Sequence, residues 1–127
     1  MPYEYLKIEK EEGIAIVILD RPPVNSLNIT AYQEIHDAFS ECEQDESIGA
    51  VVFTAVGEKI FTAGLDGKQI AGKSIPEYFA FGRVSRGCLD KIAGIRKPTI
   101  AAVFGFVLGG ALALALACDL RIASPDA

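Results

Sequence analysis

Residues 99–119 read TIAAVFGFVLGGALALALACD, and this stretch decides the fold of the chain. Nineteen consecutive residues within it, Ile100 to Cys118, carry no charge. Residues 99–104 are mostly apolar and follow a proline, which indicates a short buried strand. Residues 111–117 alternate Ala and Leu, which are strong helix formers. The stretch therefore predicts a strand, a loop and a buried helix.

Glycines separate the predicted strand from the predicted helix, and Gly109 and Gly110 immediately precede the helix. The first N–H groups of a helix have no partner inside it, and the helix dipole adds partial positive charge at the same end. Glycine also lets another group come close to the backbone. These residues therefore predict a site that binds an anion or stabilises a developing oxyanion.

Two other interpretations fit the same stretch. An uncharged run of this length can span a bilayer, and Gly105 and Gly109 form a GxxxG pair of the kind that packs membrane helices. The small residues make the run weakly hydrophobic for a span, so we expect it to be buried within a protein without membrane segments. The other interpretation gives the glycines only a packing role, between a core helix and its strand.

Length, charge and cysteine content narrow the class of protein. The 127 residues predict one domain, residues 1–127, with its own core. The net charge of −5 argues against a nucleic-acid partner, because phosphate contacts need a basic face. The three cysteines are odd in number and far apart, so we expect structural thiols and neither a disulfide framework nor a metal site. The N-terminal residues lack the apolar segment of a secretory signal, which predicts a cytoplasmic protein.

The remaining sequence alternates strand and helix patterns, which predicts an α/β fold. Residues 3–10 and 14–19 predict a hairpin whose second strand is more fully buried. An amphipathic helix follows, capped by Asn28 or Thr30, and ends within the acidic stretch 41–46. Its inward positions are Tyr32, Ile35, Phe39 and Cys42. Further predictions are a strand at 50–55, an apolar segment at 60–63 that enters a second glycine turn, a mobile surface segment at 68–73, a helix at 74–94 and a strand at 120–123.

Three motifs in this order resemble the enoyl-CoA hydratase/isomerase, or crotonase, family. They are RPPVNSLN at residues 21–28, FTAGLD at 61–66, and GFVLGG at 105–110, which continues to CDLRIAS at 118–124. The resemblance implies a spiral of ββα turns, here the N-terminal core portion of the family fold. It also implies an enzyme that acts on a coenzyme A thioester without a further cofactor, and a homo-oligomer, commonly a trimer or a dimer of trimers.

The resemblance further implies roles for individual residues. The backbone N–H groups of Leu65 and Gly110 would form an oxyanion hole for the thioester carbonyl. Residues on the substrate and coenzyme A path would be Val24, Ser26, Ala63, Gly64, Asp66, Gly109 and Ala113. Arg21 and Lys59 are candidate phosphate partners.

The sequence departs from the family at Ala113, where hydratases of the family carry a glutamate. Hydration needs carboxylates to activate water and deliver a proton, so half of the pair is absent. Some isomerases of the family lack this glutamate and use one later carboxylate. We therefore expect isomerisation of an enoyl-CoA, with the carboxylate beyond Ala127 and the 127 residues alone inactive or incomplete. The alternatives are an enoyl-CoA hydratase and a non-catalytic module for acyl-CoA binding or subunit contact. His36 is expected to be a surface or boundary residue and not a base, and Asp66 either has a structural role at its turn or transfers a proton.

Overall fold

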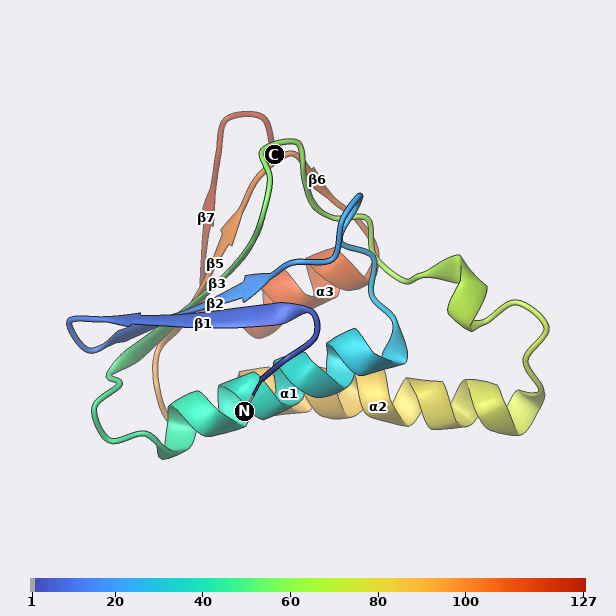
Figure 1. Ribbon diagram of the computed structural model, residues 1–127, viewed down its shortest axis with the longest axis horizontal. Helices are drawn as coiled ribbons and strands as arrows, with labels where there is room; N and C mark the ends of the chain where they lie inside the picture. The colour runs from blue at the N-terminus through green and yellow to red at the C-terminus, as the bar shows by residue number, and fades with distance from the viewer. Residues whose placement is uncertain (1) are drawn as a thin grey trace.

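A computed structural model describes residues 2–127 of the chain, shown in Figure 1. Three successive units of strand, strand and helix are followed by a last strand. The elements are β1 (Leu6–Glu11), β2 (Ile14–Leu19), α1 (Ile29–Gln44), β3 (Ala50–Ala55), β4 (Ile60–Thr62), the 3₁₀ helix η1 (Gly67–Gln69), α2 (Ile75–Gly94), β5 (Thr99–Val103), β6 (Phe106–Val107), α3 (Gly110–Ala117) and β7 (Leu120–Ala123). This recurrence confirms the predicted α/β spiral of ββα turns.

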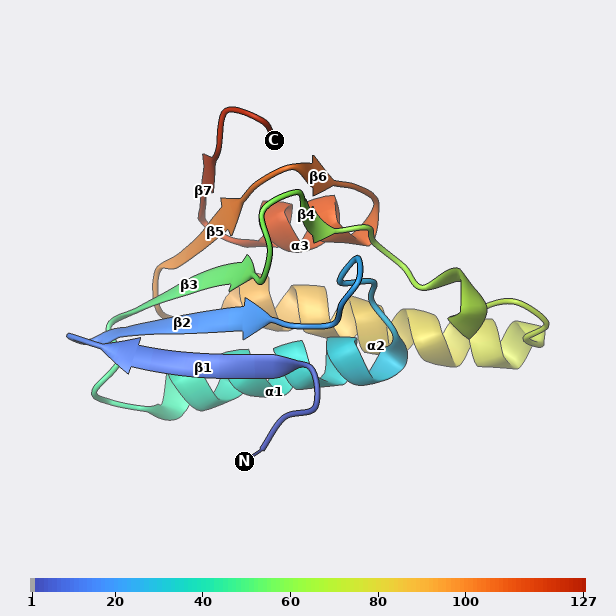
Figure 2. The same ribbon diagram turned by 45° about the horizontal axis from the view of Figure 1, so that its top comes forward.

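Two sheets organise the strands. The larger sheet has the order β1-β2-β3-β5-β7, with β1 and β2 antiparallel and the remaining neighbours parallel. The smaller sheet consists of β4 and β6, which run parallel. Figure 2 shows this pair side by side, beyond the ends of β3 and β5. Each turn of the spiral thus contributes one strand to the large sheet, and the second and third turns also contribute one to the small sheet.

The helices cover one face of the large sheet, and the core lies between the two layers (Figure 1). Phe39 of α1 packs edge to face on Phe53 of β3 at 5.8 Å between ring centroids, and Phe53 packs on Phe61 of β4 at 5.7 Å. The inward stripe predicted for α1 is buried. β2 is more fully buried than β1, as predicted, because alternate residues of β2 are buried, although Ile14 is 41% exposed. Its other face is therefore not part of the core.

The start of α1 is fixed by one side chain. Asn28 is the N-cap, and its Oδ1 accepts a hydrogen bond of 2.8 Å from the N–H of Ala31. Thr30, the alternative cap, lies inside the helix. Asn28 is also the last residue of the first motif, residues 21–28. The turn that begins α1 therefore also fixes where this motif ends.

The central stretch forms the predicted strand, loop and helix, with two differences. The loop contains β6, and α3 is not buried on all sides. Ala111, Leu114 and Ala115 are buried, whereas Leu112 and Leu116 are 46% and 60% exposed. The expectation that the whole run is buried is therefore wrong for the outward face of α3. Among residues 2–127 no helix is both long and apolar enough to cross a bilayer.

Two smaller predictions have clear outcomes. Cys42, Cys88 and Cys118 are buried free thiols, as the sequence predicts. The segment 68–73 was expected to be a mobile surface segment, but its first part belongs to η1. The carboxylate of Asp66 caps η1 by accepting from the N–H of Lys68 at 3.0 Å. An ordered turn therefore follows the second glycine motif.

Candidate functional site

The small sheet brings the two glycine turns together. β4 pairs with β6 in parallel, with Ile60 opposite Phe106 and Thr62 opposite Val107. Neighbouring parallel strands end at the same edge of a sheet, so residues 63–65 after β4 lie beside residues 108–110 after β6 (Figure 2). The turns are far apart in the sequence, and this short ladder is what joins them.

Gly64 shows how closely the two turns approach. Its φ of +89° favours glycine, and a Cβ at this position would lie 2.8 Å from the carbonyl oxygen of Leu108 and 3.4 Å from the nitrogen of Gly110. The first of these separations is too short for a real Cβ. Only glycine therefore lets the turn after β4 pack against the turn that begins α3.

Two backbone N–H groups at this junction have no acceptor among residues 2–127. One belongs to Leu65, because the parallel bridge between Leu27 and Leu65 uses the carbonyl of Gly64 and the N–H of Asp66. The other belongs to Gly110, the first residue of α3, whose N–H has no partner within the helix. Leu65 is 39% exposed and Gly110 is half-buried, so a ligand can reach both. The pair can bind one oxygen that carries or develops negative charge.

The first motif supports the second through backbone hydrogen bonds. The N–H of Leu27 donates to the carbonyl of Gly64 at 2.8 Å, and the N–H of Asp66 donates back to the carbonyl of Leu27 at 2.9 Å. The N–H of Ala63 donates to the carbonyl of Val24 at 3.0 Å. The turn that carries Leu65 is thus held on one side by the first motif and on the other by the third, so all three motifs meet here.

The buried side chain of Asn25 holds the first motif in place. It is 2% exposed and has a φ of +53°. Its Oδ1 accepts from the N–H of Arg21 at 2.9 Å, and its Nδ2 donates to the carbonyls of Val56 and Phe61, each at 3.1 Å. One buried amide therefore joins the first motif to the ends of β3 and β4.

An open cleft of about 770 Å³ lies beside these motifs. Arg21 lines it, with Nη1 donating to Ser26 Oγ at 2.8 Å and to Asp66 Oδ2 at 3.0 Å. The guanidinium also lies over the ring of Tyr5, 5.1 Å from its centroid. The lining of the cleft is Glu4, Tyr5, Asp20, Arg21, Pro22, Pro23, Val24, Ser26, Asp66 and Lys68. Four predicted substrate-path residues, Arg21, Val24, Ser26 and Asp66, thus share one surface.

The ion pair between Arg21 and Asp66 sets the charge of the cleft. The hydrogen bond from Arg21, aided by the one from the Lys68 N–H, lowers the pKa of Asp66. Burial by itself would lower the pKa of Arg21, but the hydrogen bonds and charges of Asp66 and Tyr5 together outweigh it, and the pKa is raised. Both groups are therefore charged at neutral pH and largely cancel each other. Arg21 therefore links the first motif to the second, and its charge is already paired with that of Asp66.

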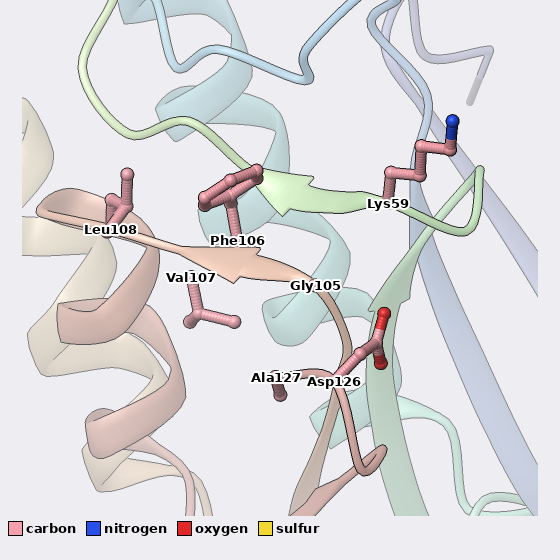
Figure 3. Close-up of a pocket in the computed structure, with 7 residues that line it drawn as sticks. All are labelled: Lys59, Gly105, Phe106, Val107, Leu108, Asp126 and Ala127. Atoms are coloured by element: carbon pink, nitrogen blue, oxygen red, sulfur yellow. The ribbon is translucent and has the colours of Figure 1, made fainter.

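Lys59 lies apart from the other predicted residues. It lines a separate pocket of about 520 Å³ with Phe106, Asp126 and others, shown in Figure 3. The cation that the structure adds to the cleft is Lys68, which the sequence analysis assigned to a surface segment. Its position two residues after Asp66 is a usable signal, because the Asp66 carboxylate accepts from the Lys68 N–H and so keeps Lys68 beside the motif.

Tyr32 is a second residue whose proximity to the site the sequence did not reveal. It lies on the inward face of α1 and is 5% exposed, as expected for a core residue. Its hydroxyl, however, points at Gly110, where an added Cβ would lie 2.5 Å from Tyr32 Oη. Ala113 lies one turn further along α3 and is half-buried, with no proton-transferring group. The sequence offered only one signal for Tyr32, a hydroxyl at a position of the inward stripe.

The comparisons with known proteins agree with this arrangement. The sequence model of the enoyl-CoA hydratase/isomerase family matches residues 9–127. A crotonyl-CoA hydratase of Syntrophomonas wolfei is 38% identical over all of this chain and 49% of its own length. A short-chain-enoyl-CoA hydratase of Clostridium acetobutylicum is 38% identical over 94% of this chain and 46% of its own.

Solved structures show the same fold. Pseudomonas aeruginosa DspI superposes with a TM-score of 0.94 at 30% identity, over 98% of this chain and 51% of the other. An enoyl-CoA hydratase/carnithine racemase from Magnetospirillum magneticum gives 0.92 at 30% identity, over 98% and 48%. The chain spans about half the length of the curated relatives it matches. Its three motifs, its spiral of ββα turns and these matches show that the chain belongs to the enoyl-CoA hydratase/isomerase family.

Proposed function

We propose that this protein binds a coenzyme A thioester and stabilises the enolate that forms from it. The observation that carries the proposal is the pair of unengaged N–H groups, on Leu65 and Gly110, at the junction of two glycine turns. Backbone donors are fixed before the reaction, so they stabilise developing negative charge without reorganising. Loss of one such donor typically raises the barrier by about 3 kcal/mol. The N-terminal end of α3 adds its dipole at the same place.

The cleft beside this junction is the proposed path of coenzyme A. Val24, Ser26 and Asp66 line it, and Ala63, Gly64 and Gly109 border the thioester end. Lys68 offers an exposed cation for a phosphate, while Arg21 keeps the cleft in shape through Asp66 and Ser26. Lys59, from its separate pocket, remains a candidate only for the outer part of a long ligand. The thioester substrate brings the coenzyme A, and the proposed chemistry uses no other cofactor.

Hydration of a short enoyl-CoA is the first candidate reaction, supported by the relatives named as hydratases. Isomerisation was the first expectation from Ala113, and it becomes the second candidate. Alanine cannot move a proton, so hydration by this protein requires carboxylates at positions other than 113. Isomerisation requires only one carboxylate. The alanine at position 113 is therefore the specific observation that keeps isomerisation a candidate.

An assay with two substrates separates the candidates. Hydration of a 2-enoyl-CoA removes the conjugation between double bond and thioester, so absorbance falls. Isomerisation of a 3-enoyl-CoA creates that conjugation, so absorbance rises. We expect the full-length protein to lower the absorbance of the first substrate. Thioester binding by calorimetry without change in either absorbance would favour the non-catalytic module, and absence of both binding and turnover would contradict the proposal.

Compartment and assembly are part of the same proposal. Three free, buried thiols support a reducing compartment, the cytoplasm. Apolar side chains on the outer side of α3 and on β7 support an interface between copies of the protein, because patches of this kind usually mark contact surfaces. These side chains, each exposed by 46–63%, are Leu112, Leu116, Leu120 and Ile122. A trimer or hexamer in light scattering would fit this reading, and a monomer would contradict it.

A further inference from the structure

The hydroxyl of Tyr32 lies at the N-terminal end of α3, next to one of the two proposed oxyanion donors. A Cβ built on Gly110 would be 2.5 Å from Tyr32 Oη. With bonds of about 1.5 Å along the backbone, Oη is at most about 5.5 Å from the nitrogen of Gly110. The Cα–Cβ direction in a helix leans toward its N-terminus, which is also the end where the free N–H groups point. Oη and the Gly110 N–H therefore border the same space.

This hydroxyl has hydrogen-bonding capacity that the described protein does not use. No side chain or backbone group of residues 2–127 forms a hydrogen bond with it, although the residue as a whole is only 5% exposed. No buried side-chain nitrogen or oxygen in the described chain is both sealed from solvent and unpaired, so solvent reaches the hydroxyl itself. Burial raises the pKa of Tyr32 to about 12, so the group is a neutral donor at physiological pH.

The ring that carries the hydroxyl is held firmly. Phe81 of α2 packs edge to face against it, with the centroids 5.8 Å apart and the planes at 87°. Leu27 of the first motif approaches the same side of Gly110, at 3.3 Å from the built Cβ. The phenol therefore reaches the start of α3 from α1, held by contacts with a second helix. A donor fixed in this way needs little reorganisation when charge develops beside it.

We propose that Tyr32 is a third hydrogen-bond donor of the thioester site, acting through Oη on the carbonyl oxygen that the N–H groups of Leu65 and Gly110 hold. The inference rests on the proposed function and deepens it. An oxygen bound by the Gly110 N–H lies about 2.9 Å from that nitrogen, in the space that Oη borders. Gly110 then has two tasks, because it supplies an N–H and leaves room for the phenol. A methyl group there would clash with the hydroxyl, at 2.5 Å.

The test compares Tyr32→Phe with the unchanged full-length protein. The probe is a saturated acyl-CoA labelled with ¹³C at the thioester carbonyl, and the readout is the carbonyl infrared band of the bound ligand. Stronger hydrogen bonding to the oxygen lowers the band frequency. We expect Tyr32→Phe to reverse part of the shift and to lower kcat about tenfold or more, with a Kd for the saturated ligand within about threefold. The control is Tyr3→Phe, which removes a phenolic hydroxyl that is bonded to Glu41 and is not part of the cleft lining.

The outcomes separate this inference from the proposed function. If the unchanged protein binds and polarises the thioester, and Tyr32→Phe gives the same band and the same kcat, the inference is wrong and the proposed function stands. If the carbonyl band of the ligand does not shift on binding to the unchanged protein, the inference about Tyr32 and the proposed function are both wrong. A merely structural role would lower the melting temperature without moving the band. If Tyr32→Phe is unstable, Tyr32→Met tests the same band shift without the ring, and an unchanged band there overturns the inference.

Discussion

Any side chain on Gly64 would place its first carbon 2.8 Å from the carbonyl oxygen of Leu108, so glycine is what lets the two turns of the site meet. We predict that Gly64→Ala separates these turns and lowers kcat/KM by about a hundredfold or more, the scale of losing one oxyanion donor. Gly57→Ala is the matched control. Gly57 has a similar φ of +100°, but a Cβ there meets nothing within 4 Å.

Both alanine variants carry the strain of a left-handed residue, which is roughly 1–2 kcal/mol. Denaturant unfolding should therefore show a loss of stability in each, while the loss of activity is confined to Gly64→Ala. Equal kcat/KM values for the two variants would mean that the close approach to Leu108 has no part in forming the site.

The Arg21–Asp66 ion pair predicts a pH dependence. Its carboxylate has a lowered pKa in the folded state, so its stabilisation is fully present above the unfolded value of about 3.9 and is lost as the pH falls through the folded value. Asp66→Asn removes this contribution. We expect the variant to have a lower Tm at pH 7 and a smaller further decrease than the unchanged protein on acidification from about pH 5.

Thermal melts at several pH values measure this difference. Asp37→Asn is a suitable control, because the Asp37 side chain is exposed and the side chain it pairs with, His36, is partly exposed. Parallel Tm curves for Asp66→Asn and the unchanged protein would contradict the assigned ion pair.

Asn25 should be the most important polar side chain for stability in the first motif. Asn25→Gly tolerates the φ of +53° but leaves the carbonyls of Val56 and Phe61 without their donor. Buried groups that lose a partner cost about 1–3 kcal/mol each. Asn28→Gly removes only a helix cap, which costs a few tenths of a kcal/mol. Urea unfolding should therefore rank Asn25→Gly well below Asn28→Gly in stability, and the reverse order would show that the Asn25 amide is dispensable.

The three thiols should be inert in the folded protein. Burial raises the pKa of Cys88 to about 12 and the pKa values of Cys42 and Cys118 to about 11. Because the thiolate is the reactive form, an aromatic disulfide reagent at pH 8 should label none of these residues until denaturant is added. Rapid labelling of one of them in the native protein would show that its surroundings open.

Much of the fold follows from local sequence patterns, and what they miss depends on contacts between distant segments. The glycines, the alternating Ala and Leu, and the capping residues predict the elements of the central stretch. They do not reveal β6, because Phe106 and Val107 become a strand only by pairing with β4. The helix α3 is apolar on every side, so its sequence cannot say that Leu112 and Leu116 face outward.

The site shows the same division. Gly64 and Gly110 are visible as glycines that follow apolar segments, and the resemblance to the family suggested their joint role. The contact of the Tyr32 hydroxyl with Gly110 joins α1 to α3, and no spacing in the sequence signals it. Lys68 was assigned to a surface segment because its neighbours are polar. Its place in the cleft depends on the cap that Asp66 gives to η1.

The central claim is that the N–H of Gly110 holds the thioester oxygen, and removing that one N–H tests it most directly. Proline suits the first position of a helix but has no N–H, and its Cβ would meet the hydroxyl of Tyr32. The comparison is therefore Tyr32→Phe against Tyr32→Phe with Gly110→Pro, both bound to ¹³C-carbonyl acyl-CoA and observed by infrared spectroscopy. We predict that the proline variant still binds the ligand but returns the carbonyl band most of the way to its position in water. An equal band shift in both variants would contradict the account.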